Sequence, residues 1–103
     1  MNRLSHYLVD RKTKGSFRAD EIPSVYGVVE CYRRFQKREF GRDLSFRKAL
    51  NEFHQYVFLP VKKEIEDEGI DKDDFYPAFM QKTFTLFGKN RKAAKESRVV
   101  NPA

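Results

Sequence analysis

Apolar residues recur at steps of three or four positions in three segments of the chain, and this spacing places them on one face of an α-helix. The first segment, residues 21–40, carries Val25, Val28, Val29, Tyr32, Phe35 and Phe40. The second, residues 46–65, has the clearest period, with Phe46, Leu50, Phe53, Val57, Val61 and Ile65. The third, residues 75–87, carries Tyr76, Phe79, Met80, Thr83, Phe84 and Phe87. The sequence therefore predicts an all-α fold, a small single-domain helical bundle of three to five helices.

Capping residues suggest where the first two of these helices begin and end. Asp20 suits the N-cap of the first, and Pro23 is tolerated in its first turn because the N–H that proline lacks is unpaired there. Gly41 predicts its end. Either Asp43 or Ser45 would cap the next helix. Gly27 lies inside the first helix and marks either a close helix–helix contact or a defect that costs about 1 kcal/mol relative to Ala.

Pro60 interrupts the strongest periodic segment. Proline removes one backbone hydrogen bond and clashes with the carbonyl four residues earlier, so we expect a kinked central helix or two helices that meet near Leu59. Gly69 would end this segment. Asp71, Asp73 and Asp74 would cap the last core helix, and Gly88 would end it.

Two ends of the chain complete the prediction. In residues 1–15, the spacing of Leu4 and Leu8 favours a short helix, and the alternative is a strand over 6–9 paired with 16–19. From residue 89 the composition becomes basic. We expect a helical domain of residues 1–88 and a basic C-terminal tail of residues 89–103.

Phenylalanine supplies much of the expected core, since the chain has ten Phe and no Trp, and each aromatic ring can bury about 150–250 Å². The residues expected to be mostly buried are Phe46, Leu50, Phe53, Val57, Val61, Val28, Val29, Tyr32, Phe79 and Phe84. Cys31 is the only cysteine, so no internal disulfide can form, and its place in the helical pattern predicts an inert core thiol. A reducing, cytoplasmic location is expected, and no apolar run is long enough to predict a membrane partner.

Charge is divided into three blocks along the chain. Residues 1–48 hold 12 Lys/Arg against 6 Asp/Glu, residues 49–79 hold 3 against 8, and residues 80–103 hold 6 against 1. The formal net charge is +6. Separation of this kind creates positive fields that attract a polyanion or the acidic face of a protein.

Arginine and lysine at helical spacing suggest where a nucleic acid would bind. Arg forms bidentate contacts with phosphate, Lys acts as a mobile point charge, and several together give a salt-dependent affinity. The candidate nucleic-acid-binding residues are Arg33, Arg34, Lys37, Arg38, Arg42, Arg47 and Lys48, with Lys89, Arg91, Lys92 and Lys95 of the tail. The other interpretation of such a face is ordinary solubilising charge.

The segment around Gly41 invites comparison with a helix-turn-helix. The match is poor, because Lys37 occupies the position, four residues before the glycine, where a small residue lets the helices approach. In such a motif the reading helix would begin near Ser45, with Arg47, Lys48 and Asn51 facing the groove.

An acidic cluster suggests a second kind of partner. Glu64, Glu66, Asp67 and Glu68 could dock a protein with a basic surface, and exposed aromatic residues could mediate such docking or a dimer. On this alternative the chain is a protein–protein interaction module, a small inhibitor or adaptor of a larger enzyme of the type that phages and plasmids encode.

The residues for catalysis or metal binding do not occur in the required patterns. A calcium loop that started at Asp71 would need Gly at its sixth position and Glu at its twelfth, which are Tyr76 and Lys82. Cys31, His6 and His54 lack the paired spacing of a zinc site. We therefore expect no cofactor and no enzymatic activity. The sequence indicates a non-catalytic regulatory or accessory protein that binds DNA, RNA or a nucleoprotein complex.

Overall fold

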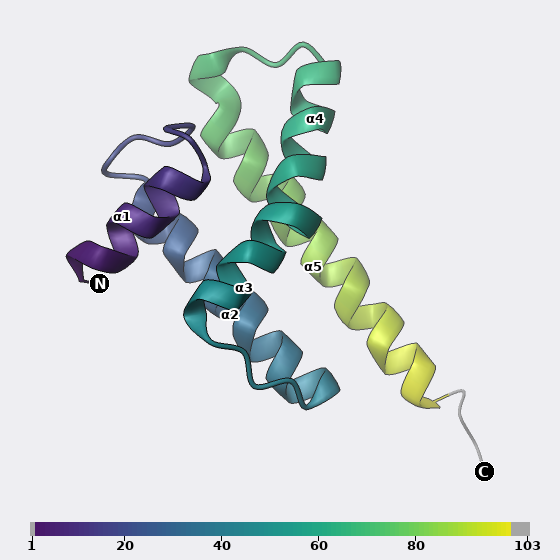
Figure 1. The fold of residues 1–103 in the computed structure, drawn as a ribbon. Coiled ribbons are helices and arrows are strands. Elements are labelled where there is room, and N and C mark those ends of the chain that lie inside the picture. The colour runs from purple at the N-terminus through teal and green to yellow at the C-terminus, as the bar shows by residue number, and fades with distance from the viewer. Residues whose placement is uncertain (1, 100–103) are drawn as a thin grey trace. The chain divides into compact units, whose positions relative to one another are not determined.

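The structure is a computed structural model that describes the backbone of residues 2–99 and the side chains of residues 2–88. Its elements are α1 (Arg3–Lys12), α2 (Ile22–Phe40), α3 (Phe46–Phe53), the π-helical segment η1 (His54–Phe58), α4 (Leu59–Asp67), the 3₁₀ turn η2 (Lys72–Asp74) and α5 (Phe75–Val99) (Figure 1). Residues 2–99 contain no strand. The all-α prediction is confirmed. α3, η1 and α4 follow one another without a break and count as one helical stretch. Counted in this way, the number of helices in the described residues agrees with the expected three to five.

The chain divides into two compact units, Met1–Pro60 and Val61–Ala103. We call them unit 1 and unit 2. Unit 1 holds α1, α2, α3 and η1, in which α2 contacts both α1 and α3. Unit 2 holds most of α4, together with η2 and α5. The sequence-based division into residues 1–88 and 89–103 stays a prediction.

Helix α1 confirms the helical alternative for the N-terminal segment. Asn2 caps it, because the Asn2 Oδ1 atom accepts a hydrogen bond of 2.7 Å from the Ser5 N–H. After Lys12 the chain turns through Lys14 and Gly15, which have φ of 52° and 71°. A left-handed conformation at two successive residues ends the helix.

Helix α2 begins one residue later than the capping pattern predicted. Glu21, not Asp20, occupies the N-cap, and its side chain makes no capping hydrogen bond to the helix. Asp20 lies in the turn before the helix and pairs with Arg18. The predicted end is confirmed. Gly41 adopts φ 66°, and its N–H bonds to the Lys37 carbonyl four residues earlier, which is the arrangement of the αL capping motif.

The expected irregularity at Pro60 lies just before it. Ser45 caps α3 by accepting a hydrogen bond of 3.2 Å from the Lys48 N–H. The helix then widens into η1, where the Leu59 N–H bonds to the His54 carbonyl five residues earlier. Widened π turns are one of the ways in which a helix departs from its regular winding. The helix continues after this turn as α4, so Pro60 does not separate two independent helices.

The start of the last helix agrees with the prediction, but its end does not. Of the three predicted capping acids, Asp71 provides the capping side chain, through a hydrogen bond of 3.1 Å from the Lys72 N–H, and η2 leads directly into α5. The predicted stop at Gly88 is wrong, because α5 continues to Val99. Residues 89–97 include several strong helix formers (Lys, Arg, Ala and Glu), and these offset the roughly 1 kcal/mol cost of one glycine.

The core contains most of the residues that periodicity selected. Of the ten, eight are buried, Phe46 is half-buried and Phe84 is 53% exposed. Thr83 is fully buried instead. Phe84 lies one residue further along α5, a rotation of about 100°, and this rotation turns its ring out of the buried stripe.

One core residue lies outside the helical patterns. Phe17, in the loop between α1 and α2, is buried, and its ring meets the ring of Phe58 edge-on at 6.0 Å. This contact holds the loop against η1 within unit 1. Along residues 2–99, none of the helices combines the length and the apolar composition that crossing a membrane requires.

Candidate nucleic-acid interface

The exposed side of α2 carries Arg34, Lys37 and Arg38, all of which are exposed. Tyr32 is buried on the side that contacts the rest of unit 1. Two residues along an α-helix correspond to a rotation of about 200°, so Arg34 points away from that core. Among the described side chains Arg34 and Lys37 make no ion pair within 4.0 Å.

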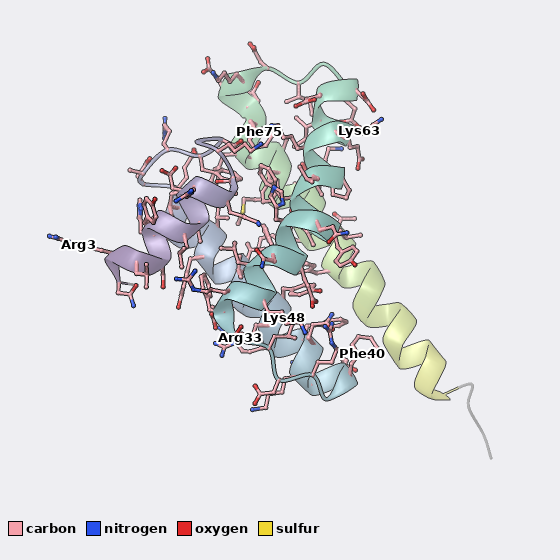
Figure 2. All side chains as sticks on the ribbon, viewed as in Figure 1. Arg3, Arg33, Phe40, Lys48, Lys63 and Phe75 are labelled. Carbon is pink, nitrogen blue, oxygen red and sulfur yellow. The ribbon has the colours of Figure 1, made fainter. Side chains whose placement is uncertain are left out.

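Arg33 does not belong to this exposed group. Its Nε donates a hydrogen bond of 2.6 Å to the Leu44 carbonyl, and its guanidinium lies 3.6 Å from the Glu30 carboxylate. The side chain thus holds the loop that leads into α3 (Figure 2 labels Arg33). Arg38 has a carboxylate neighbour as well, with 3.3 Å between its Nε and Glu39 Oε1. Of the four predicted residues of α2, Arg33 therefore has a structural role, whereas Arg34, Lys37 and Arg38 are exposed.

Arg42 belongs to a polar network that joins α2 to α3. Its guanidinium donates two hydrogen bonds to the Glu52 carboxylate, of 3.0 and 2.6 Å, and a third of 2.8 Å to the Gln36 side chain. The Tyr32 hydroxyl donates to the same carboxylate at 2.7 Å. The Glu52 side chain is only 14% exposed. Its three hydrogen bonds fix the position of α3 against α2.

The network shifts the pKa of each of its ionisable members. Hydrogen bonds from Arg42 lower the pKa of Glu52, against the opposing effect of burial. The bond to Glu52 raises the pKa of Arg42. Burial, reinforced by the hydrogen bond to Glu52, raises the pKa of Tyr32 to about 12. At neutral pH the network is therefore one carboxylate held by one cation and one neutral phenol.

The exposed side of α3 differs from that of α2. Arg47, Lys48 and Asn51 are exposed, and Gln55 follows at the start of η1 (Lys48 is labelled in Figure 2). Neither Arg47 nor Lys48 makes an ion pair within 4.0 Å in the described part of the chain. Phe46, Ala49, Leu50 and Phe53 occupy the opposite side. Arg47 and Lys48 of the predicted site are therefore available to a ligand.

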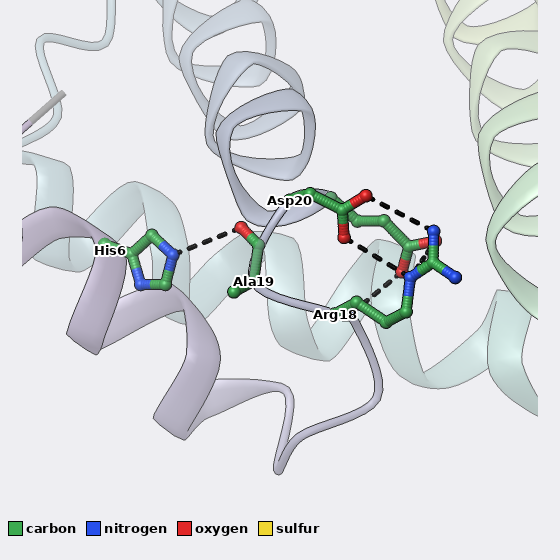
Figure 3. A network of polar contacts seen from close by, with 5 residues as sticks. His6, Arg18, Ala19 and Asp20 are labelled. Carbon is green, nitrogen blue, oxygen red and sulfur yellow. Dashed lines mark hydrogen bonds and ion pairs between the residues drawn. The ribbon is translucent and has the colours of Figure 1, made fainter.

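A second polar cluster lies in the loop before α2 (Figure 3). Arg18 pairs with Asp20 at 3.3 Å and with Glu21 at 3.7 Å, and the backbone N–H of Arg18 donates to the Glu21 carboxylate at 2.8 Å. His6 Nε2 lies 3.3 Å from the Ala19 carbonyl and ties α1 to the same loop. Both acids of this loop are used to fix its conformation.

Ion pairs leave unit 1 with unbalanced positive charge. Five of its seven acids are paired, to only four of its twelve Lys and Arg side chains. Within the described side chains, two acids remain outside ion pairs, Asp10 and Asp43. Eight cations remain outside them: Arg3, Arg11, Lys12, Lys14, Arg34, Lys37, Arg47 and Lys48. The free charge of this unit is thus mostly positive.

The acidic residues proposed as a protein-binding surface are partly occupied within unit 2. The Lys82 ammonium donates to Glu64 at 2.9 Å and to Glu68 at 3.1 Å, and these bonds raise the pKa of Lys82. Asp67 faces Lys63 at 3.6 Å in an exposed pair. Glu66 is exposed and makes no ion pair with a described side chain.

The remaining predictions concern the basic tail, the single cysteine and metal binding. The side chains of Lys89, Arg91, Lys92 and Lys95 lie outside the described residues. Cys31 is exposed, not buried, because it precedes the buried Tyr32 by one residue and is turned about 100° away from it. No group of three or more His, Cys, Asp or Glu side chains in the described part of the chain could hold a metal ion.

Sequence reasoning missed the Tyr32–Glu52–Arg42 network. One signal was present: Glu52 is the only acid between residues 44 and 60 and sits next to the apolar stripe residue Phe53. A lone acid at the edge of a buried stripe needs a cation or hydroxyl partner. Comparisons with protein-family models, with curated proteins and with solved structures find no match to this chain.

Proposed function

We propose that this protein is a non-catalytic nucleic-acid-binding or nucleoprotein-associated regulatory protein, and that unit 1 makes the contacts. The observation that carries the proposal is the pairing of charges in unit 1. Intramolecular ion pairs engage most of the acids of unit 1. Among the described side chains they leave eight cations and two acids unpaired. A phosphate backbone is the ligand class that this excess of charge suits best.

Several of these cations lie on helices that hold their positions. Arg34 and Lys37 follow one side of α2, and Arg47 and Lys48 lie in the first turn of α3, which Ser45 caps. Cations that face solvent on a folded element neutralise phosphates and release counterions when they bind. Binding of this kind is strong at low salt and largely independent of sequence.

The test measures the binding of the full chain to duplex DNA and to RNA at about 50 and about 200 mM salt, the range over which phosphate-driven affinity falls steeply. Three variants remove the same charge at different places: Arg34→Gln with Lys37→Gln, Arg47→Gln with Lys48→Gln, and the control Lys63→Gln with Lys72→Gln in unit 2. We expect at least one of the first two to lose about tenfold or more in affinity at low salt, while the control loses little. Absence of binding at the lower salt, or equal losses in all three variants, would contradict the proposal.

A second candidate function is a protein–protein interaction module, a small inhibitor or adaptor of a larger enzyme. The observation that favours it is the exposure of large apolar side chains in unit 1: Phe40 is 57% exposed, Tyr56 60% and Leu59 45%. Exposed apolar groups of this size often mark an interface.

Charge reversal separates the two functions. Glu66→Lys combined with Asp67→Lys should weaken capture of a protein partner, while the Arg34/Lys37 and Arg47/Lys48 variants should leave that capture intact. If nucleic-acid binding is absent and a stoichiometric protein partner is lost on reversal at residues 66 and 67, the second function replaces the first.

A further inference from the structure

We infer that the exposed side of α3, together with the start of η1, is a surface that reads base pairs in the major groove of duplex DNA. This inference rests on the proposed function and makes it more specific. It selects one of the two cationic surfaces of unit 1, and it names duplex DNA as the ligand.

Arg47, Asn51 and Gln55 follow one another at intervals of four residues, and all three are exposed. Residues four apart are neighbours on a helix surface, so the three side chains form a row. We call it the α3 row. At 1.5 Å per residue it extends about 12 Å, which is close to the width of the major groove, about 12 Å.

The residue types of the α3 row are those that recognise base edges. Arginine can donate two hydrogen bonds to O6 and N7 of guanine, and asparagine or glutamine can pair with N6 and N7 of adenine. Within the described part of the chain, these three side chains make no hydrogen bond or ion pair that would occupy them. Lys48 lies beside the row and is placed to contact phosphate.

The one acid of α3 is already paired within unit 1. Glu52 lies on the flank of the helix, one turn after Lys48, where Arg42 and Tyr32 hold its carboxylate, and its side chain is only 14% exposed. A free carboxylate beside the row would repel the phosphates of a duplex. Along the sequence, the nearest acid outside an ion pair with a described side chain is Asp43, which is exposed in the loop before α3.

The exposed side of α2 has cations without such amides. The amide of its Gln36 is half-buried and is engaged with Arg42, from which its side-chain oxygen accepts a hydrogen bond. Arg34 and Lys37 can neutralise phosphates but offer no pattern of donors and acceptors for a base pair. Arg34 also points away from the core that α3 covers.

Helix α3 is firmly anchored in unit 1, as a helix that reads DNA needs to be. Ser45 caps its first turn, and the rings of Tyr26 and Phe46 lie 5.3 Å apart at its start. Leu50 and Phe53 are buried. A helix anchored in this way presents its side chains without paying a large ordering entropy on binding.

The experiment enriches a pool of random-sequence duplexes for binding to the full chain and sequences the bound fraction. For the wild type we expect a short enriched motif. Asn51→Ala should reduce discrimination at one base pair by about tenfold and leave the salt dependence of binding unchanged. Gln55→Ala should act on a neighbouring position. The amide control Gln81→Ala in unit 2 and the double variant Arg34→Gln, Lys37→Gln should both keep the motif.

The outcomes separate this inference from the proposed function. Salt-dependent binding without any enriched motif, a preference for single strands or RNA, or a motif that survives both Asn51→Ala and Gln55→Ala would each overturn the inference and leave the proposed function standing. Absence of binding to every nucleic acid at low salt would overturn both. Circular dichroism should show unchanged helix content in each variant, since the substituted side chains are exposed.

Discussion

Glu52 shows how one side chain determines the local geometry of unit 1. Its carboxylate accepts hydrogen bonds from Tyr32 on α2 and from Arg42 in the loop, so three segments meet at one acid. Hydrogen bonds to a charged, shielded group are stronger than those between neutral groups. The sequence indicates that Glu52 is an unusual acid in an apolar segment, but its partners follow only from the way α2 and α3 pack.

We expect Glu52→Gln to change how the free energy of unfolding depends on pH in the acid range, which we call the acid limb of the stability curve. The folded-state pKa of Glu52 lies below its ordinary value of 4.5, so its ionisation stabilises the folded state above that pH. This contribution is lost as the pH falls through 4.5 toward the lower folded-state value. Urea unfolding from pH 7 to pH 3 should therefore show a steeper loss of stability for the wild type than for Glu52→Gln.

The matched control is Glu66→Gln, which removes an exposed carboxylate that has no ion pair among the described side chains. Its acid limb should follow that of the wild type. If Glu52→Gln and Glu66→Gln flatten the curve equally, the network does not hold in solution.

Cys31 provides a second test at the scale of the residue. Its exposure predicts that a thiol reagent modifies it completely under native conditions, with no loss of helical circular dichroism. A buried thiol would react only after unfolding. Protection of Cys31 in buffer, with reaction restored by urea, would contradict the orientation of α2 that turns Tyr32 inward.

At the scale of the element, periodicity and capping residues predict α1, α2 and the α3–η1–α4 stretch well. The Ser45 cap and the Gly41 end depend on short-range geometry that the sequence contains directly. Prediction fails where a long-range contact, or the combined helix propensity of several residues, determines the structure. Phe17 becomes part of the core through its contact with Phe58, and α5 continues through Gly88 because the residues after it favour helix.

The placement of the candidate site residues could be predicted only in part, for the same reason. The spacing of Arg34, Lys37, Arg47 and Lys48 is enough to place them on exposed helix sides. The pairing of Arg33 with the Leu44 carbonyl and of Arg42 with Glu52 depends on the path of the loop between α2 and α3. Helical periodicity alone cannot describe that path.

Alanine substitution should have opposite effects on stability at Gly27, inside α2, and at Gly41, which caps its C-terminal end. At Gly27 nothing lies within 4 Å of the position that a Cβ would take, so no close helix contact requires the glycine. Gly27→Ala should raise the free energy of unfolding by about 0.5–1 kcal/mol. Gly41 has φ 66°, and Gly41→Ala should lower it by about 1–2 kcal/mol.

Chemical denaturation of the two variants measures both effects. Loss of stability in Gly27→Ala would indicate a contact in α2 that the structure does not contain. An unchanged midpoint in Gly41→Ala would mean that the end of α2 does not need the left-handed conformation.

For the whole molecule, the distribution of charge is the property that leads to a function. The net charge of +6 can be counted from the sequence. Which charges are free cannot, because folding pairs five acids of unit 1 with four cations and so determines the free remainder. The proposed function and the inference about α3 both depend on this remainder.

The salt dependence of duplex binding tests this claim most directly. If α3 and neighbouring cations neutralise two to four phosphates, the logarithm of the binding constant should fall linearly with the logarithm of salt concentration, with a slope between about −2 and −4. A slope near zero, or no measurable binding at about 50 mM salt, would show that the unpaired cations of unit 1 do not contact a phosphate backbone.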